Sequence, residues 1–178
     1  FGVGYGKEDR FRVFNQTRKL GFLGGARRLE LLLKHSYLEP YNIDVKFIEP
    51  LFFSYKTALE INPFLRKENE PGYIASRRGG RIAILHRITT YLKGSMAYIY
   101  ENVSLDTLDE SFSPDDLGNR ESFYDKSGPV LGFTWDNSSP LFSPDKGYFF
   151  LTSLKLNGFT SDAAYPFMKV LIDVRRYS

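Results

Sequence analysis

Apolar and polar side chains alternate along most of the chain with a period of two. In the segment 41–48, the residues at 41, 43, 45 and 47 are apolar or aromatic, and those at 42, 44 and 46 are polar. A period of two places successive side chains on opposite faces of a strand, whereas a helix repeats every 3.6 residues. No segment carries a sustained helical stripe, so the pattern predicts an all-β protein with little or no helix.

About ten such segments are separated by turn-forming residues, which favours a sheet built of antiparallel hairpins. Most links are short, but the link 104–128 is long and rich in Asp and Glu. The predicted strands are 1–6, 10–18, 26–37, 41–49, 55–66, 74–87, 91–103, 129–137, 146–158 and 164–177.

Strand length and the charge of the polar parity favour an antiparallel transmembrane β-barrel. Several predicted strands reach the about 9–11 residues that cross a bilayer at a tilt, and aromatic residues gather near strand ends, as in interfacial girdles. The alternative is a soluble antiparallel protein with a Phe-rich core. In the barrel, we expect the charged parity to face the lumen, and its residues are Arg28, Glu30, Lys34, Asp44, Lys46, Lys169, Asp173 and Arg175.

The composition predicts no enzyme, metal site or cofactor. The chain has no Cys, and its His residues, His35 and His86, lack the spacing of metal ligands. The acidic residues Asp115, Asp116, Asn119 and Glu121 have no glycine-pinned calcium loop among them, so we expect a solvated loop. The net charge of +3 is too small an excess of basic residues to indicate a nucleic-acid partner, which would need a clustered basic face.

Four motifs, in their order and spacing, resemble the barrel of BamA-type outer-membrane insertases, the bacterial surface antigen superfamily. They are the glycine-alternating strand 1–6, the turn 20–29 (LGFLGGARRL), the turn 49–53 (EPLFF) and the element 132–148. In the last motif, Ser138 and Ser139 stand where many members of the superfamily have Arg-Asp.

The resemblance implies that residues 1–178 are the N-terminal part of a barrel of about sixteen strands. Periplasmic POTRA repeats would precede this part and closing strands would follow it. The implied location is the bacterial outer membrane, and the implied partners are the lipid bilayer, client outer-membrane proteins, the POTRA repeats and accessory lipoproteins. The links near 19–25, 50–54, 88–90 and 138–145 would then face the periplasm, and the links near 7–9, 38–40, 67–73, 104–128 and 158–163 the exterior.

The first strand is the implied lateral gate, where client strands would pair. Glycines at 2, 4 and 6 share one parity, so this strand offers few side chains for cross-strand packing. From the residues alone, a weak edge and a tight barrel corner are both open readings. Alternatives to insertion are a two-partner-secretion exporter and a passive channel. The residues of the implied gate are Phe1, Gly2, Val3, Gly4, Tyr5 and Gly6.

Overall fold

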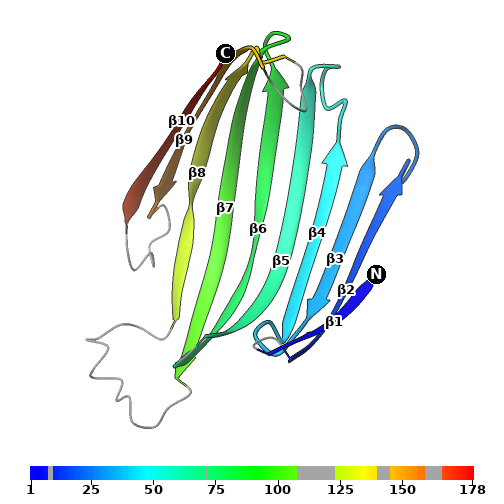
Figure 1. Cartoon of the computed structure of the whole chain (residues 1–178), viewed down its shortest axis with the longest axis vertical. Helices are drawn as coiled ribbons and strands as arrows, with labels where there is room; N and C mark the ends of the chain where they lie inside the picture. Colours follow the sequence, from blue (N-terminus) through cyan, green and yellow to red (C-terminus); the bar gives the residue numbers. More distant parts are fainter. Residues whose placement is uncertain (8–9, 71, 108–122, 140–144, 159–165) are drawn as a thin grey trace.

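The computed structural model is a single antiparallel sheet of ten strands, in which each strand lies beside its neighbours in sequence (Figure 1). It describes residues 1–7, 10–70, 72–107, 123–139, 145–158 and 166–178. The outer strands of the sheet are β1 and β10. The strands are β1 (Gly2–Gly6), β2 (Arg10–Leu20), β3 (Arg28–His35), β4 (Tyr41–Glu49), β5 (Thr57–Glu70), β6 (Tyr73–Arg87), β7 (Leu92–Thr107), β8 (Phe123–Asp136), β9 (Gly147–Asn157) and β10 (Phe167–Tyr177).

The all-β prediction is confirmed, and the described residues form no helix that could cross a membrane. The predicted link 104–128 is too long, because β7 runs to Thr107 and β8 begins at Phe123. At the end of β7 the alternation is reversed: Val103 and Leu105 lie on the parity that carries Lys93 and Glu101, and Asn102 and Ser104 lie on the other. Backbone pairing continues where the outward parity is no longer apolar, and this is why the pattern made both strands too short.

One face of the sheet is apolar from β3 to β10. Residues directly opposite each other on neighbouring strands lie on the same face, and the register pairs Leu31 with Val45 and Ile61 with Ile82. Large side chains on this face are exposed, including Met96 at 57% and Ile172 at 63%. So large an apolar surface is typical of contact with lipid or with another protein.

The opposite face is polar, and it holds the buried apolar residues, all of which are small. Ala75, Ala83, Ala97 and Val103 are at most 5% exposed, and the register of β6 and β7 puts all four on this polar face. No Phe or Leu is fully buried in the described part of the chain. A soluble barrel with a Phe-rich core would show the reverse, so this sheet turns its apolar face outward.

Ion pairs link the strands across the polar face. Glu60 of β5 lies 2.9 Å from Nζ of Lys46 on β4 and 2.5 Å from Nη1 of Arg81 on β6. Its side chain is only 12% exposed, so it receives both cations in a partly desolvated position. On the neighbouring rows, Asp44 binds Arg66 at 3.0 Å.

Backbones approach closely where β6 passes β7 at Gly79. A Cβ at this position would lie 2.1 Å from the carbonyl oxygen of Tyr100 and 2.9 Å from Cα of Glu101. Both obstacles are backbone atoms, so a side chain here forces the two strands apart. The next residue, Gly80, has no atom within 3.4 Å of its Cβ position, which makes it a matched control.

We therefore predict that Gly79→Ala destabilises the folded sheet by about 1–3 kcal/mol, while Gly80→Ala leaves stability unchanged or slightly raised. The measurement is the temperature at which the full-length protein loses its fast-migrating folded band on SDS gels. Equal melting temperatures for the two variants would contradict the close approach of β6 and β7.

We predict that Glu60→Gln costs about 1–3 kcal/mol, because Lys46 and Arg81 lose their shared partner on the polar face. The matched control is Glu68→Gln on the same strand, since its partner Arg77 retains Glu101 at 3.7 Å. Urea unfolding of the full-length protein in lipid vesicles measures both. The three-strand link is refuted if the control loses as much stability as Glu60→Gln.

Candidate functional site

The first strand of the sheet, β1, is paired with β2 and with no other described strand. Its register against β2 runs from Gly2 opposite Phe14 to Gly6 opposite Arg10. The other edge of β1 therefore presents backbone N–H and C=O groups that no described strand pairs, which is the template for adding a further strand.

The glycines of β1 lie on the polar face, and side chains from β2 lie over two of them. A Cβ at Gly2 would meet the ring of Phe14 at 2.4 Å, and a Cβ at Gly4 would meet Nε of Arg12 at 2.7 Å. The strand itself contributes no side chain to this face, but β2 covers it, so the face is not bare as the sequence alone suggested. These obstacles are the ends of flexible side chains, so they can move without displacing the backbone.

On the apolar face, β1 carries side chains that reach away from the rest of the sheet. Val3 is 61% exposed and Tyr5 is 81% exposed, and they lie opposite Val13 and Phe11 of β2. Phe1, the first residue of the predicted gate, precedes the strand. The arrangement combines an apolar outer face with an unpaired backbone edge, which is the surface that an incoming amphipathic strand would extend.

All eight residues predicted to face the lumen share the polar face of the sheet. Arg28 and Arg18 both bind Glu30, at 3.0 and 2.9 Å. On β10, Arg175 binds Asp173 at 2.6 Å, and Lys169 lies opposite Lys155 of β9. The remaining three residues also form ion pairs, namely Asp44 with Arg66, Lys46 with Glu60 and Lys34 with Glu39.

The sequence analysis missed the polar-face residues of β5 to β7, although their alternation could have revealed them. Glu60, Arg66 and Glu68 share one parity of β5. Arg77 on β6 lies between two acids, 3.3 Å from Glu68 and 3.7 Å from Glu101. The polar face is thus a network of alternating charges and not a surface of one sign.

A polar cluster interrupts the apolar face near one end of β6, β7 and β8. Nε of Arg78 donates to Asn102 at 3.0 Å, and the Asn102 amide donates to Asp125 at 2.5 Å. The hydroxyl of Tyr100 also donates to Asp125, at 3.1 Å. A charged residue in an otherwise apolar parity was the available sequence signal, and it marks where the apolar band ends.

At the other end, the links 21–27, 50–56 and 88–91 lie side by side; we call this the short-turn end (top of Figure 1). Here Trp135 and Tyr148 stack with 6.5 Å between ring centroids, and Arg27 binds Glu49. Aromatic rings and ion pairs therefore border the apolar band, as they do at the interfaces of membrane barrels.

The remaining candidate residues form no metal or catalytic constellation in the described segments. His86 shares a 2.9 Å hydrogen bond with Thr57 on the neighbouring strand, and Nδ1 of His35 lies 2.6 Å from the Pro40 carbonyl oxygen. No group of three His, Asp or Glu that could hold a metal occurs among the residues that the structure covers. The calcium candidates Asp115, Asp116, Asn119 and Glu121 lie outside the described residues.

Comparison with solved structures finds the same fold in BamA from Haemophilus ducreyi, in a crystal structure that lacks POTRA domains 1–3. The TM-score is 0.68 at 17% sequence identity, and the match covers 90% of this chain. It covers only 34% of the BamA chain, so the sequence spans about a third of that relative.

No curated protein matches the chain. The Omp85 superfamily domain, in contrast, matches residues 21–178. This range begins in the turn before β3 and includes every strand from β3 to β10. Together with the antiparallel meander and its outward apolar face, this match establishes that the chain belongs to the Omp85 superfamily.

Proposed function

We propose that this chain is part of the β-barrel of an outer-membrane insertase, and that client strands enter the membrane along the free edge of β1. The observation that carries the proposal is the composition of the edge strand β1, in which the glycines at 2, 4 and 6 alternate with Val3 and Tyr5. Membership of the Omp85 superfamily and the BamA-like fold support it.

The energetics of the bilayer explain why such an edge would bind a strand. Unpaired backbone N–H and C=O groups cost several kcal/mol each in hydrocarbon. An incoming strand satisfies these groups, and its alternate apolar side chains would continue the face that Val3 and Tyr5 begin. Because β1 has only Val3 and Tyr5 as side chains between its glycines, the existing pairing is weak, so strands can exchange at this edge.

The barrel that contains this sheet would hold further strands, because a membrane does not tolerate a strand edge that is permanently unpaired. The outer edges of this sheet would therefore be paired, or open only transiently. We propose POTRA repeats on its periplasmic side, accessory lipoproteins bound to them, and client outer-membrane proteins as substrates. The short-turn end would face the periplasm. The cell location that follows is the bacterial outer membrane, with the apolar face of the sheet against lipid.

Two other functions use the same fold. They differ from insertion in that the outer edge of β1 stays paired. A passive channel or an exporter of soluble passengers would keep β1 paired permanently, with the polar face lining its pore. The ion pairs of Glu30, Glu60 and Arg77 would then form the pore wall. Such a wall has its charges paired with one another, which gives little preference for ions of either sign.

A disulfide scan in the full-length protein, with any cysteines outside residues 1–178 replaced by serine, tests the proposal; residues 1–178 contain no Cys. Val3→Cys and Tyr5→Cys are each combined with single cysteines along the last strand of a nascent porin. We expect adducts at one register of the client strand, because backbone pairing fixes which residues lie opposite each other. Asp173→Cys on the polar face of β10 serves as the control and should give none.

The scan also identifies the alternatives. Efficient bonding of Val3→Cys to the last strand of its own barrel, with no client adduct, would show a permanently closed seam. The insertase proposal would then be abandoned for a channel or an exporter.

A further inference from the structure

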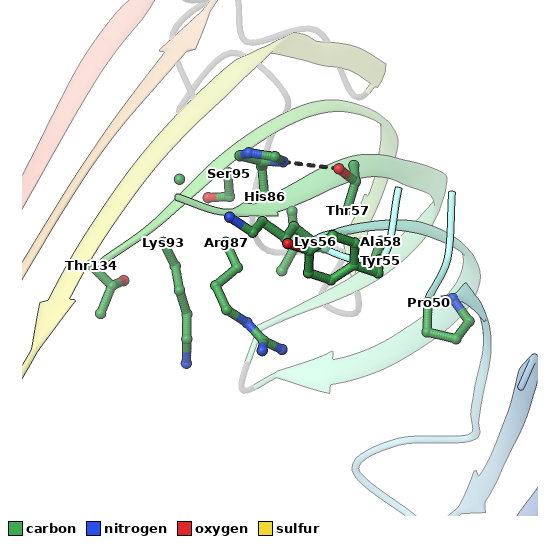
Figure 2. A pocket seen from close by; sticks show the side chains of 12 residues that line it. Pro50, Tyr55, Lys56, Thr57, Ala58, His86, Arg87, Lys93, Ser95 and Thr134 are labelled. Carbon is green, nitrogen blue, oxygen red and sulfur yellow. Dashed lines mark hydrogen bonds between the residues drawn. The ribbon is translucent and has the colours of Figure 1, made fainter. Parts of the chain in front are cut away.

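A pocket opens at the short-turn end, between the turn 50–56 and the strands β6, β7 and β8, with a volume of about 310 Å³. Figure 2 shows the side chains that line it. Three of them are cations from different parts of the sheet, namely Lys56 in the turn, Arg87 at the end of β6 and Lys93 at the start of β7. No Asp or Glu is part of the lining.

Two of the cations lie in an unfavourable arrangement. Arg87 and Lys93 are directly opposite each other in the register of β6 and β7, and their side chains point the same way in Figure 2, on the side away from His86 and Thr57. Like charges directly opposite each other destabilise a sheet. Within the described residues, none of the three cations has a carboxylate within ion-pair distance, and the charge of Asp136 attracts Lys93 only from a longer range.

A second pair of opposed cations shows how the same sheet compensates repulsion elsewhere. Arg66 and Arg77 are also directly opposite each other. In that pair, Asp44 binds Arg66, and Glu68 and Glu101 flank Arg77. Lys155 and Lys169 are opposed as well, so what distinguishes Arg87 and Lys93 is that a third cation, Lys56, lines the same pocket.

The acids nearest to the pocket already have partners. Asp136 follows Thr134 on the polar face of β8, and it accepts hydrogen bonds from the backbone N–H of Ser138 at 3.1 Å and from its hydroxyl at 2.6 Å. Glu49, which precedes the turn, binds Arg27. Asp136 attracts Lys93, but no carboxylate of the described residues lines the pocket, so the three cations leave it with a net positive charge.

We propose that this pocket binds an acidic polypeptide segment through its carboxylates. The cations occupy the polar face, opposite the apolar face of the sheet, so a ligand reaches them from water and not from the lipid side. Tyr55, 77% exposed, lines the pocket and adds an aromatic surface. Leu51 and Phe53 on the same turn are 59% and 90% exposed, which suits a segment that mixes acidic and apolar residues. The inference does not depend on whether client strands pair with β1.

The test uses the full-length protein in detergent micelles and a fluorescein-labelled peptide of alternating Asp and Phe. We expect binding that weakens as salt is added, and a double variant Arg87→Gln/Lys93→Gln that binds at least about tenfold more weakly. The matched control is Lys19→Gln/Arg176→Gln, which removes the same charge at the short-turn end but on the apolar face. It should bind as the wild type does. The conservative variant Arg87→Lys should retain binding.

Equal affinity of the two double variants, or equal affinity for a peptide with Asn in place of Asp, would overturn the proposal. A phospholipid ligand is the rival outcome, and nanodiscs of phosphatidylglycerol and of phosphatidylcholine test it. If Arg87→Gln/Lys93→Gln lost only a preference for phosphatidylglycerol, the site would be a lipid site and the acidic-peptide proposal would fall. Should the double variant not fold, Lys93→Gln alone is measured, with an intact folded band on SDS gels as the criterion.

Discussion

The bilayer requires every backbone polar group to be paired, and the rest of this structure depends on that constraint. A meander of ten strands meets it for all strands except at the outer edges, β1 and β10. Because backbone pairing is fixed by the meander, side chains are free to divide between two environments. Apolar residues such as Met96 and Ile172 face outward, and the polar face keeps only small residues such as Ala83 and Val103 fully covered.

The two faces differ in how they hold the strands together. The apolar face adds little attraction between side chains in lipid, since hydrocarbon is as apolar as Leu. On the polar face, carboxylates such as Glu60 and Glu30 each bind cations from two positions, and they link neighbouring strands at partly desolvated sites. Cross-strand ion pairs there join β2 to β3, β4 to β5, β5 to β6 and β6 to β7, in addition to the backbone ladder. Strand β1 has glycine on this face, so it lacks that reinforcement.

The alternating glycines of β1 and the three cations around one pocket, Lys56, Arg87 and Lys93, depart from the pattern of the other strands. The opposed cations Arg66 and Arg77, in contrast, have acidic neighbours. Departures of this kind are expected at functional sites, because stability is given up there for a specific interaction. They also lie far apart on the sheet, one at its outer edge and one at the ends of its central strands (Figures 1 and 2).

A period of two is a local and strong signal, so the alternation of the sequence is enough to place the strands and to put Arg28, Glu30 and Asp44 on one face. The alternation does not locate the ends of β7 and β8, where the outward parity becomes polar, with Asn102, Ser104 and Asp125, and backbone pairing continues. The tertiary structure alone decided the register, since it depends on contacts between residues distant in sequence. Register is what sets Gly79 against the Tyr100 carbonyl, Glu60 between two cations, and Arg87 opposite Lys93.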